Sequence, residues 1–121
     1  MTEIQNTKQY DLEERTARFA EVCRNFVRKL SKNTTNFEDG KQLVRSSGSQ
    51  AANYIEANES VSKKDFVHRI KICRKETKES NLWLRLCDTR NDENLQKTRE
   101  GLIKEATELR KIFTSILEKS K

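Results

Sequence analysis

Proline is absent from the 121-residue sequence, and glycine occurs only three times. Because β-sheet proteins depend on turns rich in these residues, their scarcity disfavours an all-β fold and favours long helices. No apolar run approaches the roughly 20 residues of a membrane span, and the N-terminus lacks the basic-then-apolar pattern of a secretion signal. We therefore expect an all-α, soluble, cytoplasmic protein that does not interact with a membrane.

Residue types that commonly perform catalysis or bind metals are also scarce. Histidine occurs once, as His68, and the three cysteines Cys23, Cys73 and Cys87 form no Cys-x-x-Cys pair. The sequence has no phosphate-binding loop, no Ser-His-Asp set and no Glu-x-x-His motif of the kind that binds iron in helical bundles. We therefore expect no catalytic residue, no metal site and no cofactor, and we interpret the cysteines as small core residues.

Hydrophobic residues recur at alternating spacings of four and three along most of the chain, as they do in helices packed along their length. Phe19, Cys23, Phe26 and Leu30 are one such series. Helix N-caps are predicted at Asp11, Asn36 and Ser62. The pattern predicts four helices, at about residues 11–32, 36–59, 62–89 and 95–116.

Short polar connections between these helices favour an antiparallel up-down-up-down four-helix bundle. A chain of 121 residues is long enough for one hydrophobic core and too short for two. We therefore predict a single four-helix bundle domain over residues 11–121, preceded by a flexible N-terminal segment over residues 1–10.

The second predicted helix has an unusual centre, where Ser46, Ser47, Gly48 and Ser49 follow one another although serine and glycine are poor helix formers. Such a run is tolerated where a neighbouring helix approaches the backbone closely and the added contacts offset the poor propensity. We predict that a stripe of this helix faces small residues of the third helix. The stripe is Val44, Gly48, Ala51 and Ile55, and the facing residues are Thr77 and Ser80.

A second stripe on the third helix places Glu76 and Glu79 between apolar residues, on a face distinct from the core. The second helix carries an arginine, an amide and a carboxylate that can form hydrogen bonds and ion pairs with this stripe. Acids framed by a tryptophan indicate a hydrogen-bonded seam that becomes buried, at a subunit contact or just beneath one. The predicted polar seam comprises Arg45, Asn53, Glu56, Glu76, Glu79 and Trp83. The alternative is a solvated face that carries one isolated aromatic residue.

Positive charge is concentrated in the third helix. The net charge is +6, and residues 62–90 carry nine lysines or arginines against four acids. With the core side facing inward, the outward face carries His68, Lys71, Lys75, Lys78 and Arg85, a stripe that an oligomer would repeat around its axis. The candidate phosphate-binding residues are Lys63, Lys64, Lys71, Arg74, Lys75, Lys78 and Arg85. The alternative is a basic face that is merely solvated.

Three segments together resemble a known family: "DLEERTARFA", "LVRSSGSQAANYIEANESVSKKDF" and "KICRKETKESNLWLRL". In order and spacing they are similar to the proteins encoded in intervening sequences of bacterial 23S rRNA genes. That family is itself similar to the accessory variability proteins of diversity-generating retroelements. The resemblance covers roughly residues 11–117. The sequence departs from the family pattern at Gly48, where a larger residue is usual, and at "IEANES", where "AEG" is common.

The resemblance implies a closed homopentamer of antiparallel four-helix bundles around a central channel, without known catalytic activity. By position, Arg45, Asn53, Glu56 and Glu76 match polar residues that recur in the family. The sequence and the resemblance together favour a non-enzymatic oligomeric accessory protein that binds RNA or structured DNA through phosphates. The alternative is a scaffold or adaptor that docks a protein such as a reverse transcriptase.

Overall fold

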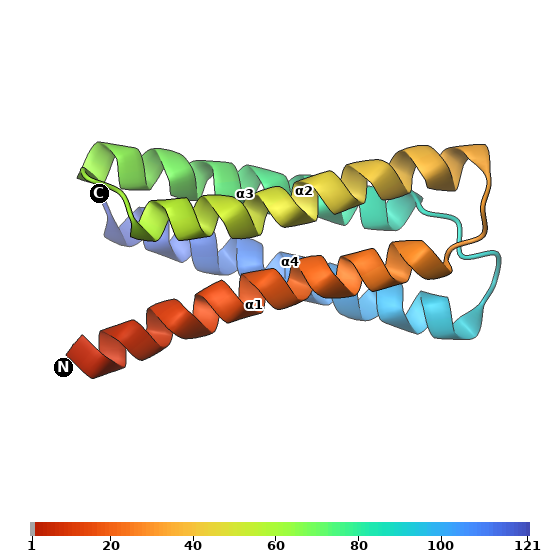
Figure 1. The fold of residues 1–121 in the computed structure, drawn as a ribbon, viewed down its shortest axis with the longest axis horizontal. Coiled ribbons are helices and arrows are strands. Elements are labelled where there is room, and N and C mark those ends of the chain that lie inside the picture. The colour runs from red at the N-terminus through yellow and green to blue at the C-terminus, as the bar shows by residue number, and fades with distance from the viewer. Residues whose placement is uncertain (1) are drawn as a thin grey trace.

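Four long α-helices make up the protein in the computed structural model (Figure 1). The structure describes residues 2–121, with side chains from residue 11 onward. The helices are α1 (Thr2–Lys29), α2 (Thr34–Asn58), α3 (Lys63–Leu86) and α4 (Glu93–Lys119). No strand occurs among residues 2–121, so the predicted all-α fold with four helices is confirmed.

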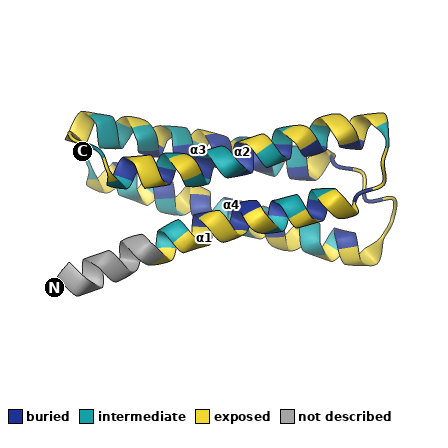
Figure 2. Cartoon of the chain, viewed as in Figure 1, coloured by how far each residue is buried: buried dark blue, intermediate teal, exposed yellow. Residues whose placement is uncertain are grey.

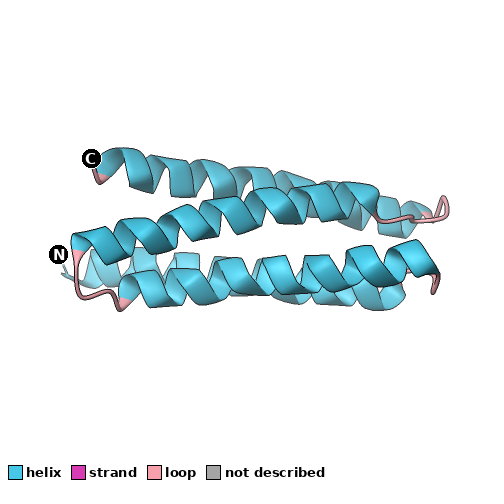
Figure 3. Ribbon diagram, turned by 90° about the horizontal axis from the view of Figure 1, so that it is seen from above, coloured by secondary structure: helices cyan, strands magenta, loops and turns pink. Residues whose placement is uncertain are grey.

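The chain reverses direction at each connection, and the connections gather at the two ends of the molecule (Figures 1 and 3). Each helix contacts two others: α1 lies against α2 and α4, and α3 lies against α2 and α4. None of the helices in the described part of the chain is long and apolar enough to cross a membrane.

Side-chain caps define where α2, α3 and α4 begin. The Ser62 hydroxyl accepts a hydrogen bond from the Asp65 backbone N–H at 3.1 Å, as the sequence predicted for α3. The cap of α2 is Asn33 rather than the predicted Asn36, and the Asn33 side chain accepts from the Asn36 backbone N–H at 2.8 Å. Asp92 caps α4 in the same way.

The predicted cap at Asp11 is wrong, because α1 begins at Thr2 and Asp11 lies inside the helix. The predicted flexible segment over residues 1–10 lies outside the residues whose side chains the structure describes. The predicted end of the third helix at about residue 89 is also too late. The helix ends at Leu86, and Arg90 and Asn91 adopt positive φ angles in the connection to α4.

Asn36 has a different role from the predicted one: it joins two connections at one end of the bundle. Its Nδ2 donates to the backbone oxygens of Ser31 and Asp88, at 3.0 and 2.9 Å. Its Oδ1 accepts from the Asp88 backbone N–H at 2.8 Å. Asn36 itself is buried, and these three bonds satisfy backbone groups of both connections. The α1–α2 and α3–α4 connections are thereby held together.

The buried face of α2 differs from the predicted stripe. Ile55 is exposed, and Val44, Gly48 and Ala51 are only half-buried. The buried side is rotated by about one residue from the predicted stripe and carries Ser46 and Ser47. Figure 2 draws the buried residues of the helices in dark blue. The buried residues of α2 are Asn36, Gly40, Leu43, Ser46, Ser47, Gln50, Tyr54 and Ala57. Ser46 and Ser47 are therefore core residues of the bundle, whereas Ser49 is half-buried.

The serines fit because α2 lies close to its neighbours. Ser46 and Ser80 share a buried hydrogen bond of 2.7 Å between α2 and α3, and Thr77 is buried beside them. On the α1 side, Gly40 is the glycine that allows close approach. A Cβ atom there would lie 2.9 Å from Cγ1 of Val27, closer than such contacts normally are. At Gly48 the nearest atom would be the flexible end of the Arg24 side chain, at 3.0 Å.

Candidate functional site

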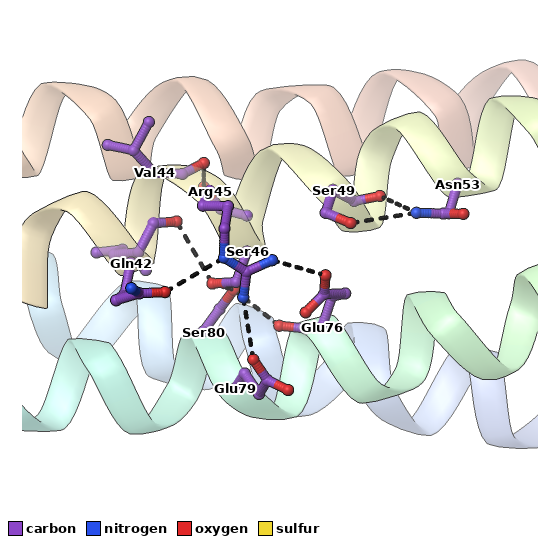
Figure 4. A network of polar contacts seen from close by, with 11 residues as sticks. Gln42, Val44, Arg45, Ser46, Ser49, Asn53, Glu76, Glu79 and Ser80 are labelled. Atoms are coloured by element: carbon purple, nitrogen blue, oxygen red, sulfur yellow. Dashed lines mark hydrogen bonds and ion pairs between the residues drawn. The ribbon is translucent and has the colours of Figure 1, made fainter.

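An arginine on α2 binds two glutamates on α3 at the surface where these helices meet. Arg45 donates from Nη1 to Oε2 of Glu76 and from Nη2 to Oε1 of Glu79, each at 3.1 Å (Figure 4). Its Nε donates to Oε1 of Gln42 at 3.2 Å. The guanidinium group therefore holds three side chains with three different nitrogens, which orients the whole group.

The two ends of the Arg45–Glu76 pair differ sharply in burial. The Glu76 side chain is 7% exposed, whereas the Arg45 side chain is 51% exposed. The Glu76 hydrogen bond is the main cause that raises the pKa of Arg45 above its ordinary value, with a smaller contribution from the charge of Glu79. Glu76 thus depends on Arg45 for its neutralisation, while Arg45 has water and Glu79 besides.

A second polar group continues the same side of α2. Asn53 donates from Nδ2 to the backbone oxygen and the hydroxyl of Ser49, at 2.9 and 3.1 Å (Figure 4). Its Oδ1 accepts from Nη1 of Arg69 on α3 at 3.0 Å. Asn53 therefore pairs with an arginine that the sequence analysis did not select, rather than with Arg45. Glu56 is exposed, and its side chain has no hydrogen bond to another residue of the part of the chain whose side chains the structure describes.

Trp83, the aromatic residue of the predicted seam, lies on α3 four residues after Glu79. Its ring is half-buried and packs against the hydrophobic core. Its Nε1, like Oε1 of Glu76 and Oε1 of Gln50, is buried without a hydrogen-bond partner in the described part of the chain. Of the six predicted seam residues, the structure brings together Arg45, Glu76 and Glu79 in one network. From here, the polar seam denotes the residues of this network: Gln42, Arg45, Glu76 and Glu79.

The predicted phosphate-binding cations lie on the outward side of α3. Arg74 is half-buried and the others are exposed. The exposed ones, here called the basic face, are Lys63, Lys64, Lys71, Lys75, Lys78 and Arg85. Among residues 11–121, no basic-face side chain forms a salt bridge; the five that occur involve other cations. Because Glu76 and Glu79 are held by Arg45, the basic face keeps its positive charge.

A groove between α3 and α4 extends the basic face. This α3–α4 groove has a volume of about 690 Å³, and its cations include Arg110 of α4. The groove is lined by Lys75, Thr77, Lys78, Glu79, Asn81, Leu82, Arg85, Ala106 and Arg110. The sequence analysis missed Arg110, because nothing in the local pattern of α4 shows which of its cations will lie beside α3.

Two further hollows lie at the surface. One of about 490 Å³, at the start of α3, is lined by Lys63, Lys64, Val67, His68 and Lys71 and belongs to the basic face. The other, of about 820 Å³, lies where α1 is connected to α2 and includes Leu30 and Gly40. Phe37 lines this second hollow and is 68% exposed, which is unusual for a large aromatic side chain.

The described residues offer no constellation suited to a metal. No group of three or more His, Cys, Asp or Glu side chains comes together within the described residues. Cys23, Cys73 and Cys87 are free and buried, as the sequence analysis predicted for core residues. Burial raises the pKa of Cys23 and of Cys73 to about 12 and that of Cys87 to about 11, so all three are neutral thiols.

The fold and the site define a small four-helix protein with a polar seam between α2 and α3 and a strongly basic side on α3. The sequence profile of the 23S rRNA-intervening sequence protein family matches residues 8–115. The chain therefore belongs to the 23S rRNA-intervening sequence protein family, as the resemblance of its motifs indicated.

A solved structure supports the fold. The chain is similar to a protein with unknown function from the S23 ribosomal protein family of Bacteroides thetaiotaomicron, with 29% sequence identity and a TM-score of 0.78. The similarity covers 92% of this chain and 98% of that one. The comparison with curated proteins gives no match.

Proposed function

We propose that the chain is a non-enzymatic accessory protein that assembles as a closed homo-oligomer and binds RNA or structured DNA through phosphates. The observation that carries this proposal is the basic face, whose six cations are exposed and form no salt bridge with the described carboxylates. Exposed cations that are not neutralised by the protein are free to replace the counterions of a polynucleotide.

The segregation of charge supports the same proposal. Glu76 and Glu79 are on the same helix as the basic face, yet both are paired with Arg45 of α2; Glu79 also lines the α3–α4 groove. Lysines on a helix surface act as point charges and contact phosphates rather than base edges. The basic face is therefore suited to binding with little sequence preference.

The oligomer is the second part of the proposal, and we take it to be a homopentamer of antiparallel bundles in the cytoplasm. Among the described residues, Oε1 of Glu76 and Nε1 of Trp83 are buried without partners, and Leu86, three residues after Trp83, is 52% exposed. A subunit packed near the polar seam would cover this leucine. Repeating the basic face around a ring multiplies weak phosphate contacts into useful affinity.

The experiment replaces Lys71, Lys75 and Lys78 together by glutamine and measures RNA binding by mobility shift at two salt concentrations. The matched control replaces Lys97, Lys104 and Lys111, which are exposed on α4. Each phosphate contact contributes about 0.7 to 0.9 to the slope of log affinity against log salt, so the α3 variant should lower the slope by about 2 to 3. Light scattering establishes that both variants keep the assembly of the unmodified protein.

Equal RNA affinity and equal salt slope for the two triple variants would overturn the assignment of the basic face. A clean monomer of the unmodified protein at micromolar concentration would overturn the oligomer. The experiment therefore separates the two parts of the proposal.

The second candidate function is a protein-docking scaffold or adaptor, for example for a reverse transcriptase. One observation favours it: the exposed Phe37 lies over the partly apolar hollow at the α1–α2 connection, where no cation of the basic face takes part. Loss of partner binding in Phe37→Ser, with RNA binding unchanged, would favour this function over the first.

A further inference from the structure

The α3–α4 groove combines positive charge with an exposed apolar side chain. Leu82 is 44% exposed and lines the groove together with Lys78 and Arg85. These three residues follow one another at spacings of four and three, so they lie on one side of α3. Contact between the exposed leucine and water is unfavourable. A flat apolar group carried on an anionic chain would cover the leucine while the chain contacts the cations.

The register of α3 against α4 fixes what lies across the groove. Asn81 donates from Nδ2 to the Thr107 hydroxyl at 3.4 Å. Since the two helices run in opposite directions, as Figure 1 shows, Lys78 lies at the level of Arg110 and Leu82 at the level of Ala106. The groove thus has an apolar middle, with Lys78 and Arg110 toward one end. Arg85 lies about 10.5 Å further along α3, at 1.5 Å per residue.

The middle of the groove also offers a hydrogen-bond acceptor. Asn81 is half-buried and uses its Nδ2 on Thr107, and no donor among the described residues reaches its Oδ1. An amide oxygen beside an apolar surface can accept from the exocyclic amino group of a nucleobase. The groove therefore provides for a base as well as for phosphates.

We propose that the α3–α4 groove binds a short stretch of single-stranded polynucleotide. Its phosphates contact Lys78, Arg110 and Arg85, while one unstacked base covers Leu82 and donates to Oδ1 of Asn81. A duplex cannot bind in this way, because its bases are stacked inside and only phosphates and base edges face the protein. This inference rests on the proposed nucleic-acid binding and adds a preference for single strands.

The experiment uses the full chain and four labelled probes in fluorescence anisotropy titrations. The probes are a 12-nucleotide single-stranded RNA, a DNA strand of the same sequence, the RNA annealed to its complement, and polyphosphate, which has no base. The DNA strand tests whether the ribose 2′-hydroxyl matters, since RNA and DNA single strands share the phosphate and the base. Circular dichroism melting confirms that each variant is folded.

Two groove variants test the phosphate contact and the base contact separately. Arg110→Gln removes a cation outside the basic face, and its control is Lys111→Gln, the exposed neighbour outside the groove. We expect Arg110→Gln to weaken single-strand binding about 3-fold to 10-fold and to lower the salt slope by about 0.7, the value for one phosphate of a single strand. Lys111→Gln should leave both quantities unchanged.

Leu82→Ser removes the apolar middle of the groove without changing charge. We expect it to weaken binding of single strands several-fold at an unchanged salt slope, and to leave duplex and polyphosphate binding as they are. Equal affinities of the unmodified protein for single strand and duplex, or equal losses with all four probes in Leu82→Ser, would overturn the groove inference. Phosphate binding by the basic face would survive that result. Absence of binding to every probe would overturn the proposed function as well.

Discussion

Breaking the Arg45–Glu76 pair from either side should give unequal losses of stability, because only one partner is buried. Arg45→Gln leaves a carboxylate that is 7% exposed without its cation, and Glu76 Oε1 already lacks a hydrogen bond. Removing one partner of a fully buried pair costs about 3 to 5 kcal/mol. Arg45 is half-exposed and water can partly replace it, so we expect about 2 to 3 kcal/mol for Arg45→Gln.

The opposite change should be milder. Glu76→Gln keeps the shape of the side chain and removes the buried charge, while Arg45 keeps Glu79 at 3.1 Å and Gln42 at 3.2 Å. We expect a loss of about 0.5 to 1.5 kcal/mol, the ordinary net value of one hydrogen bond. The double variant should lose less than the sum of the single variants, because it contains no uncompensated buried charge.

The assay is urea unfolding followed by circular dichroism at one fixed protein concentration, since assembly adds a concentration-dependent contribution to stability. Arg18→Gln is the matched control. Arg18 lies 3.7 Å from Glu21, and both side chains are mostly exposed, so its loss should stay within about 0.5 kcal/mol. A larger loss for Glu76→Gln than for Arg45→Gln would refute the reasoning, as would an Arg45→Gln loss no larger than that of the control.

Three further predictions concern two glycines and a buried cysteine. Gly101→Ala should raise the free energy of unfolding by about 0.5 to 1 kcal/mol, because nothing lies near its Cβ position and alanine is the better helix former. Gly40→Ala should instead lower the melting temperature, because its Cβ meets the stiff Val27 side chain at 2.9 Å. Equal shifts of the melting temperature in Gly40→Ala and Gly101→Ala would contradict this, because α1 would then move aside without a loss of stability. For Cys23, burial raises the folded-state pKa from the ordinary cysteine value of 9.0 to about 12, so the folded state keeps a proton that the unfolded state loses. Its contribution to stability is therefore complete below about pH 9 and falls by about 1.4 kcal/mol per pH unit above it. The same slope in Cys23→Ala, measured by urea unfolding at pH 8 to 10.5, would contradict this.

Much of the local structure could be predicted from periodicity. The four-three spacing places Phe19, Cys23 and Phe26 on one side of a helix, and all three are buried in the core. The Ser62 cap could be predicted because the capping hydrogen bond joins residues three apart in sequence. The pairing of Arg45 with Glu76 and Glu79 was also anticipated, since opposite charges lay on facing stripes of consecutive helices.

The errors have a common physical cause. Each residue turns a helix by about 100°, so the sequence shows that a stripe exists but leaves its orientation open where two stripes are equally plausible. On α2 the stripe of Val44 and Gly48 competed with the stripe of Leu43 and Ser46. Packing against α1 and α3 selected the second, because serine hydroxyls found partners there: Ser46 bonds to Ser80 at 2.7 Å.

The sequence by itself determined four helices, the distribution of charge along them and the residues able to form a polar seam, because these depend on neighbours within a few turns. Only the tertiary structure decided the contacts between distant segments. It brought Asn36 to the backbone of Asp88, Arg69 to Asn53 and Arg110 to the basic side of α3. These contacts depend on helix rotation and register, which the packing of the whole core sets and no local pattern encodes.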